Sequence, residues 1–140
     1  MIRQVHREIS VATRGRGLMD ITRQVESCLA QSELRDGLLT LLVRHTSASL
    51  LIQENADPDV RDDLDRFFGR AVPDGDPLYE HTLEGPDDMA AHVRSALTCV
   101  SLSIPFRERS LVLGTWQGVY LWEHRTAPHR RLIAVHLLGE

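Results

Sequence analysis

The sequence predicts a single α+β domain over residues 1–140, with an antiparallel or mixed β-sheet in a sandwich-like arrangement and two to three helices. Three observations predict this class. A chain of 140 residues can bury one hydrophobic core but is too short for two. Apolar residues make up 42% and charged residues 26%, which is typical of globular proteins. Strand patterns flank the helical ones without regular βαβ alternation, and the last four strands follow one another closely.

The first part of the chain, up to residue 52, is expected to contain two strands and one helix. Residues 2–11 alternate between apolar and polar side chains, as in a half-buried strand. Asp20 is a suitable N-cap for a helix whose apolar side chains recur three to four residues apart. The continuous apolar run 38–43 predicts a buried strand, which passes through His45 and continues over residues 48–52.

Two further helices are expected in the middle of the chain. Residues 57–69 form the first, with Asp57 as cap, Pro58 in the first turn and Gly69 as its end. Turn-forming residues predict a loop over 71–80. The second helix begins in the segment 84–88, where a proline and acidic residues suit a first turn.

From residue 100 onward the chain alternates between strands and turns. The expected strands are 100–104, 111–113, 118–123 and 132–138, and the turns lie at 105–109, 114 and 127–128.

Composition limits the function classes. The net charge of −4 argues against a nucleic-acid-binding protein. No apolar run is long enough to span a bilayer, and charged residues interrupt any N-terminal signal segment, so a cytoplasmic location is expected. Cys28 and Cys99 each lie in an apolar stretch and are read as free buried thiols of a reducing compartment, although a disulfide between them stays open.

Three histidines stand in polar settings, and together they are the main functional signal. They are His45 in a His-Thr-Ser-Ala-Ser string, His81 after Tyr-Glu, and His92 in the second middle helix. Imidazole is the commonest protein metal ligand and the usual proton shuttle near neutral pH. If the three converge, they form a metal or acid–base site. Otherwise His45 belongs to a polar strand face, and the other two are solvated or satisfied in the core.

Carboxylates and amides near these histidines are further candidates. Asp88 precedes His92 by one helical turn, so its carboxylate can fix the tautomer of the imidazole. Glu54 and Asn55 precede a helix but are not needed as its caps, unlike Asp57.

The C-terminal third offers aromatic and basic side chains. Trp116, Tyr120 and Trp122 share one side of a regular strand, and core or interface packing explains them better than ligand stacking. Arg125 and the Arg130-Arg131 pair can hold phosphate or form a solvated edge cluster. His6, His124 and His129 are read as surface or incidental residues.

Five strings, in order and over nearly the whole chain, resemble the secondary thiamine-phosphate synthase family. They are His45–Leu50, Glu54–Arg61, Glu84–Asp88 with His92, Gly114–Gly118, and Arg130-Arg131 with Gly139-Glu140. The resemblance implies a compact α+β domain, a homotrimer, and a metal site at His45, His81 and His92. It also implies a side activity that joins hydroxymethylpyrimidine diphosphate to thiazole phosphate and releases pyrophosphate.

On this basis we assign expected roles to the candidate residues. Glu54, Asn55 and Asp88 are the expected catalytic residues. The expected substrate-binding residues are Ser47, Gln117, Arg125 and Arg131. The expected partner is a small, phosphorylated molecule, with no nucleic acid and no membrane.

The cofactor is expected to be a divalent ion, zinc or magnesium. Displacement of diphosphate usually employs Mg²⁺, which prefers oxygen ligands, whereas three imidazoles suit zinc. Three functions therefore stay open: the family transferase, a metal-dependent hydrolase of a small phosphorylated metabolite, and a non-catalytic trimeric metal-binding protein.

Overall fold

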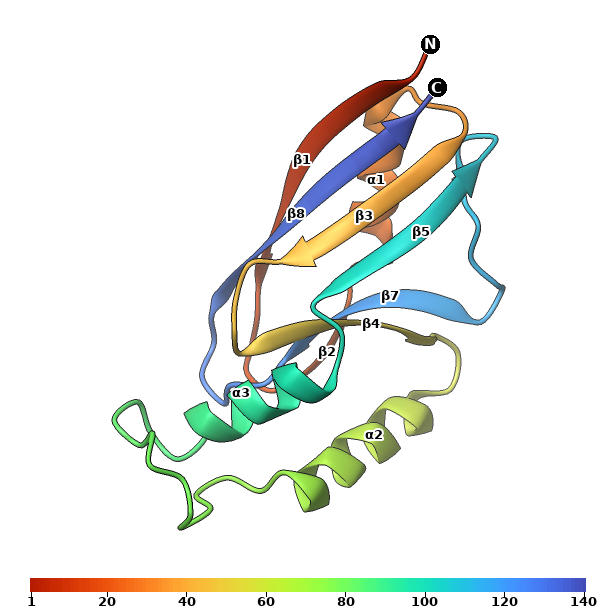
Figure 1. The fold of residues 1–140 in the computed structure, drawn as a ribbon. Coiled ribbons are helices and arrows are strands. Elements are labelled where there is room, and N and C mark those ends of the chain that lie inside the picture. Colours follow the sequence, from red (N-terminus) through yellow and green to blue (C-terminus); the bar gives the residue numbers. More distant parts are fainter.

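The computed structural model describes residues 1–140. Its eight strands form two antiparallel sheets, and three helices pack against them (Figure 1). A five-stranded sheet has the order β1-β8-β3-β5-β6, and a three-stranded sheet has the order β2-β7-β4. The strands are β1 Arg3–Ala12, β2 Gly17–Asp20, β3 Gly37–Val43, β4 Ala48–Glu54, β5 Ser101–Arg107, β6 Ser110–Leu111, β7 Gln117–Glu123 and β8 Arg130–Gly139, and the helices are α1 Thr22–Ser32, α2 Pro58–Ala71 and α3 Asp88–Leu97. The predicted α+β class with up to three helices is confirmed.

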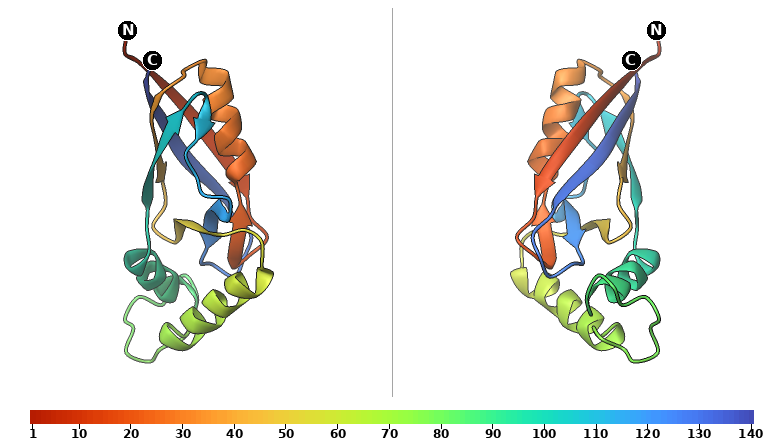
Figure 2. Two further views of the ribbon diagram at one scale, coloured as in Figure 1. Left: turned by 90° about the vertical axis from the view of Figure 1, so that its right-hand side faces the viewer. Right: turned by 90° about the vertical axis from the view of Figure 1, so that its left-hand side faces the viewer.

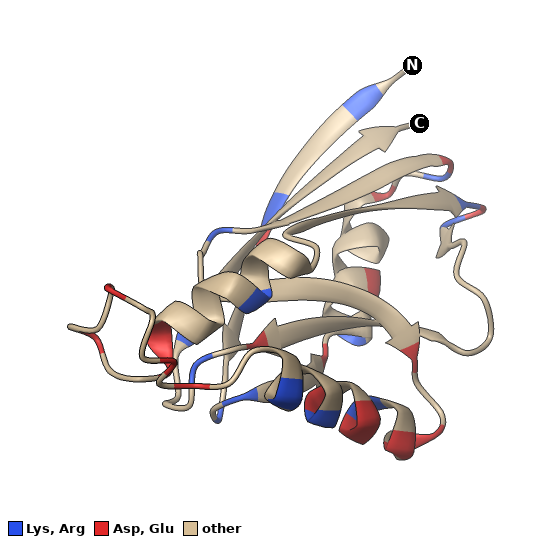
Figure 3. Cartoon of the chain, turned by 60° about the horizontal axis from the view of Figure 1, so that its bottom comes forward, with Lys and Arg blue, Asp and Glu red and all other residues tan.

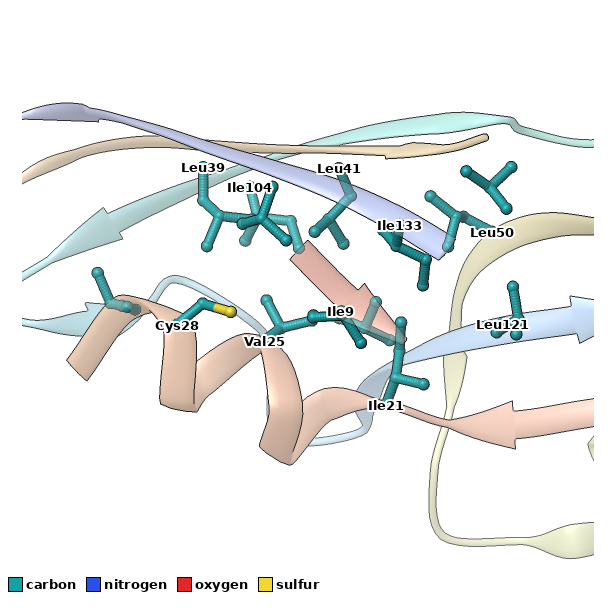
Figure 4. Close-up of a cluster of buried hydrophobic side chains, with 14 of the residues drawn as sticks. Ile9, Ile21, Val25, Cys28, Leu39, Leu41, Leu50, Ile104, Leu121 and Ile133 are labelled. Atoms are coloured by element: carbon teal, nitrogen blue, oxygen red, sulfur yellow. The ribbon is translucent and has the colours of Figure 1, made fainter. Parts of the chain in front are cut away.

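The larger sheet curls around α1, which packs against its concave face (Figure 2). Strand alternation decides which side chains enter this core: Leu39 and Leu41 of β3 point inward and are fully buried, whereas Leu38 is 42% exposed on the outer face. Figure 4 shows Val25 and Cys28 of α1 facing these side chains. The apolar core therefore lies between α1 and the larger sheet.

The smaller sheet is buried on both faces along its central strand, β7. Val119 and Leu121 join the main apolar core. Tyr120 and Trp122 alternate with them and point to the opposite face, where the Phe68 ring of α2 meets Trp122 edge-on at 4.9 Å between centroids. Because successive side chains of β7 pack alternately into the main core and against α2, this strand connects the core to the helical end of the molecule.

Helices α2 and α3 lie at the end of the molecule opposite the two termini (Figures 1 and 2). Helix α3 packs on β4, where the Ser95 hydroxyl donates to the Ala48 carbonyl at 3.2 Å. Helix α2 has no fully buried residue. Its C-terminal end is tied to α3 by Arg94, whose Nη2 donates to the Val72 carbonyl at 3.0 Å. The two helices thereby frame the loop 72–87.

One predicted helix end was wrong, and the start of another helix lies at the edge of its predicted segment. Helix α2 continues through Gly69 to Ala71, because Gly69 keeps a helical conformation and is not among the glycines with positive φ. Helix α3 begins at Asp88, the last residue of the expected start segment 84–88, so Pro86 lies before the helix and not in its first turn. Gly85 has φ 104°, outside the helical region, and the Asp87 carboxylate makes no cap because it binds Arg125 instead.

Other local predictions also needed correction. The turn expected from Pro105 begins later: β5 runs through Pro105 to Arg107, and Glu108 and Arg109 turn with positive φ. The strand expected to continue past His45 breaks there, because β3 and β4 belong to different sheets. Cys28 is buried as expected, but Cys99 is exposed, and both thiols are free. None of the three helices has the length and apolar character needed to cross a membrane.

Candidate metal centre

His81, Asp88 and His92 bring three potential ligand atoms within 4.8 Å of one another. Oδ2 of Asp88 lies 2.6 Å from Nε2 of His81 and 3.2 Å from Nε2 of His92. The two imidazole rings face each other edge to face, 5.5 Å apart. Two imidazoles and one carboxylate form a typical donor set for zinc and related transition ions.

The local structure explains why these groups meet. Asp88 and His92 are one turn apart on α3, so their side chains share a face. His81 reaches them from the loop 72–87. Nδ1 of His92 donates to the Thr46 carbonyl at 2.9 Å, which leaves Nε2 directed toward Asp88. Metal-bound histidines are usually held in this way through their second nitrogen, so the residues present fit an ion.

Arg125 fixes the carboxylate side of the centre. Its Nη1 lies 3.0 Å from Asp88 Oδ1, and its Nε donates to Asp87 Oδ2 at 2.9 Å. Burial acts to raise the pKa of both carboxyls. At Asp87, hydrogen bonds from Arg125 and the Thr126 amide outweigh burial and lower the pKa to about 2. At Asp88, contacts with His81, His92 and Arg125 likewise leave the pKa below its usual value. Asp88 therefore presents an ionised carboxylate to the centre.

The surroundings of the centre are acidic. Residues 72–88 include no lysine or arginine, and Figure 3 shows acidic positions along this loop. Asp88 itself is buried, but the side chains of His81 and His92 are 45% and 31% exposed. An ion held here would consequently be attracted by negative charge and would remain reachable from solvent.

His45 is not part of this three-residue group. It lies on the loop between β3 and β4, and its Nε2 accepts a hydrogen bond from the Leu132 amide at 2.8 Å. Because Nε2 accepts this hydrogen bond, the proton of the ring lies on Nδ1. Burial and the positive charge of Arg131 lower the pKa of His45. The adjacent Thr46 holds His92, so the predicted His-Thr-Ser-Ala-Ser loop does border the centre.

A buried ion pair holds this loop in place. Arg131 forms a two-point pair with Glu123, and both side chains are almost completely buried. The same guanidinium donates to the hydroxyl and carbonyl of Ser47. Thr13 adds a hydrogen bond to Glu123 at 2.7 Å. Ser47 and Arg131, expected to bind substrate, are thus occupied by protein partners inside the fold.

The other predicted site residues lie at the far end of β4. Glu54 and Gln117 pair across β4 and β7. Asn55 Nδ2 donates to the Gln117 carbonyl at 3.4 Å, and the Glu54 carboxylate accepts from the Asp57 amide. Since Thr46 precedes the opposite end of this seven-residue strand, the polar group lies about 20 Å from the histidines. One chain does not bring the two sets together.

The sequence interpretation missed three important polar residues. His124, read as incidental, is fully buried with Nε2 2.8 Å from the Ser49 hydroxyl. Glu123 and Asp87 anchor Arg131 and Arg125, respectively. The one available signal was the run Glu123-His124-Arg125 directly after the apolar strand residues, where buried charge requires partners. Trp116, grouped with Tyr120 and Trp122, precedes β7 and is exposed.

Comparison with known proteins places the chain among close relatives. It is 53% identical to the UPF0047 protein sll1880 of Synechocystis, over 96% of this chain and 92% of that one. It is 45% identical to the UPF0047 protein YjbQ of Salmonella typhimurium, over 96% of this chain and 97% of that one. A crystal structure described as a YbjQ-like protein of unknown function from Sulfolobus solfataricus superposes with a TM-score of 0.89, at 27% identity, over the full length of both chains. Another, of a conserved hypothetical protein from Thermus thermophilus, gives a TM-score of 0.84 at 38% identity, over 93% of this chain and 98% of that one.

The family described as UPF0047 protein YjbQ-like matches residues 7–140. The chain belongs to this family.

Proposed function

We propose that the protein is a divalent-metal-dependent enzyme whose ion is held by His81, Asp88 and His92. The observation that carries the proposal is the convergence of their ligand atoms within 4.8 Å while both imidazoles stay partly exposed. Zinc sites with three protein ligands keep a position for substrate, whereas structural zinc sites are closed by four. The arrangement therefore supports catalysis over a purely structural ion.

The donor set favours zinc or a related transition ion over magnesium. Two of the three donors are imidazole nitrogens, and Mg²⁺ prefers oxygen ligands in octahedral geometry. When bound, the ion would polarise an oxygen atom of the substrate and stabilise developing negative charge. Arg125 keeps Asp88 ionised and oriented, and Thr46 fixes the ring of His92.

For the substrate, we propose a small phosphorylated molecule, in line with the resemblance to secondary thiamine-phosphate synthases. The reaction would join hydroxymethylpyrimidine diphosphate to thiazole phosphate and release pyrophosphate. His45, with Nδ1 protonated on the same loop as the Thr46 that holds His92, is the residue available to donate a hydrogen bond to the leaving diphosphate. Since Arg125 and Arg131 both bind carboxylates, the ion has to supply most of the positive charge.

The engaged arginines also favour a second candidate, hydrolysis of a small phosphorylated metabolite. A diphosphate transferase needs several positive groups around its substrate, whereas hydrolysis of one ester at a single ion needs fewer. Reaction with water instead of a second substrate would then be the main activity.

We further propose that the chain assembles as a homotrimer in which neighbours share the site. Glu54, Asn55 and Gln117 lie about 20 Å from the histidines within one chain. A neighbouring chain that places this strand end beside the loop 72–87 would bring both sets together. Light scattering on a sizing column tests the trimer. Mixing Glu54→Ala with His92→Ala protein tests the shared site, because only mixed trimers would regain activity.

Metal analysis of the purified protein is the first test of the centre. We expect about one zinc-class ion per chain, lost in His92→Ala and retained in His129→Ala. His129 is a suitable control because its side chain is 33% exposed, close to the 31% of His92. Equal ion content in both variants would remove the proposed centre.

Activity assays then separate the two reactions. Pyrophosphate release that requires both phosphorylated substrates and His92 supports the transferase. Release of inorganic phosphate from simple esters, again dependent on His92, supports the hydrolase. If the ion-loaded protein turns over neither class above the His92→Ala control, the catalytic proposal fails.

A further inference from the structure

Four buried polar atoms with no partner at normal hydrogen-bond distance lie where α2 and α3 cover the smaller sheet. They are Asp65 Oδ1 on α2, Arg94 Nε on α3, Trp122 Nε1 on β7, and Nδ1 of His124 directly after β7. The residues Arg94, Trp122 and His124 are each at least 98% buried. Buried polar atoms are nearly always paired, either with protein groups or with ordered water. Four such atoms from adjoining elements need a common explanation.

These atoms belong to one polar cluster. The rings of Trp122 and His124 lie 5.2 Å apart. Burial raises the pKa of the Asp65 carboxyl. The Trp122 indole N–H, which lies near enough to act on this carboxyl as a hydrogen-bond donor, and the charge of Arg94 oppose that effect. Arg94 also acts on His124, whose other nitrogen lies 2.8 Å from the Ser49 hydroxyl.

The hydrogen-bonding chemistry of the cluster matches water. Trp122 Nε1 and Arg94 Nε can only donate, and Asp65 Oδ1 accepts while ionised. His124 is buried and neutral, so Nδ1 accepts when Nε2 donates to Ser49. A water molecule accepts two hydrogen bonds and donates two, so it complements a set of two donors and two acceptors.

We propose that an internal hydration site lies between α2 and the smaller sheet, where ordered water bridges Asp65, Arg94, Trp122 and His124. This site is separate from the metal centre and does not depend on the proposed function. It adds to the contacts of Arg94 with Val72 and of Phe68 with Trp122 that hold α2, a helix without a fully buried residue, against the body of the protein. Leaving these groups dry and unpaired would be strongly unfavourable, whereas bridging water satisfies them at little entropic cost.

Water–protein NMR tests the site directly, because the chain has two tryptophans and one serves as the control. The Trp122 indole proton is expected to show a cross-peak to water that is positive in NOESY and negative in ROESY, the signature of a long-lived neighbouring water. The Trp116 indole, which is exposed, should show only rapid exchange with bulk water. Absence of the Trp122 cross-peak would overturn the proposal.

A matched pair of variants tests the connection to α2. Trp122→Phe removes the N–H but keeps an aromatic ring against Phe68. We expect it to speed hydrogen exchange of the α2 amides at least several-fold and to lower Tm by roughly 3 to 6 °C. Trp116→Phe should change neither. A crystal structure in which Asp65 bonds Trp122 directly and all four atoms have protein partners would also refute the bridging water.

Discussion

The two ends of the molecule are stabilised by different kinds of interior. The upper region, formed by the five-stranded sheet and α1, contains most of a single cluster of 19 buried apolar residues. The lower region, formed by the smaller sheet, α2, the loop 72–87 and α3, buries polar side chains. Apart from Ser32, every buried polar residue lies in the lower region or where the larger sheet meets it. Apolar burial stabilises the fold without fixing individual contacts, whereas paired polar groups fix the geometry that a metal centre needs.

The largest effect is expected from the buried ion pair in the lower region. Glu123→Gln leaves Arg131 buried beside a neutral partner and should lower the free energy of unfolding by about 3 to 5 kcal/mol, measured by urea denaturation. Glu8→Gln is the control, because Glu8 and Arg44 form an exposed pair that should contribute less than about 1 kcal/mol. Equal losses in the two variants would contradict the view that polar burial stabilises the lower region.

The apolar interior should respond nearly as strongly to truncation. Leu39→Ala opens a cavity beneath α1 and should reduce the unfolding free energy by about 3 kcal/mol. Leu38→Ala, on the exposed face of the same strand, should cost less than about 1 kcal/mol. Metal content should stay unchanged in both folded variants, since this strand contributes no residue to the centre. A loss of metal in Leu39→Ala would show that the two regions are not independent.

The pH dependence of stability should identify His124. Burial, followed by the positive charge of Arg94, lowers its pKa from 6.5 to about 3. The unfolded chain therefore binds more protons than the folded one between these values, so stability is complete above pH 6.5 and falls as the pH drops toward 3. Between pH 7 and pH 5 the expected loss is about 2 kcal/mol.

His124→Gln isolates this contribution. Over the same pH interval its unfolding free energy should change much less than that of the wild type, measured by parallel denaturation curves. The carboxylates with lowered pKa, Asp87 and Glu123, titrate below this interval and do not obscure the comparison. An unchanged slope in the variant would mean that His124 is not kept neutral by burial.

The smallest effect is expected at the edge of the centre. Arg125→Lys replaces a guanidinium that binds Asp87 and Asp88 at once, and lysine cannot make both contacts with the same geometry. Zinc affinity should fall by about tenfold, measured by competition with a chelating dye. Arg130→Lys is the control, since Arg130 is exposed and donates to Ser10 away from the centre. Equal affinities would show that Arg125 does not position Asp88.

Much of the fold could be predicted because its strands show regular apolar patterns. The β3 run and the alternation of β1 were located to within one or two residues, since burial on one or both faces determines these patterns. One helix end was misplaced because Gly69 was taken as a helix terminator, whereas it keeps a helical conformation. The start of α3 was located to the segment 84–88, but Asp87 gives it no side-chain cap because its carboxylate binds Arg125, which is 38 residues away.

The candidate site was predictable only where its contacts are local. Asp88 and His92 are one helical turn apart, so their contact follows from spacing. The approach of His81 and the displacement of His45 depend on how the loops fold back. Arg125 and Arg131 were assigned to phosphate because the sequence does not reveal that distant carboxylates already engage them. The periodicity of apolar residues does not predict which distant charged residues form ion pairs.

The double burial of β7 makes its register unusually sensitive to insertions and deletions. Successive side chains at the end of β7 face opposite sides: Trp122 and His124 face the proposed hydration site, and Glu123 faces Arg131. A shift by one residue would exchange these surroundings. Glu123 would then lie where the Trp122 indole now packs on Phe68, and Arg131 would lose its counter-ion. Length changes should therefore be tolerated in the exposed connection 114–116 but not between Gly118 and Arg125, a contrast that a deep insertion–deletion scan would reveal.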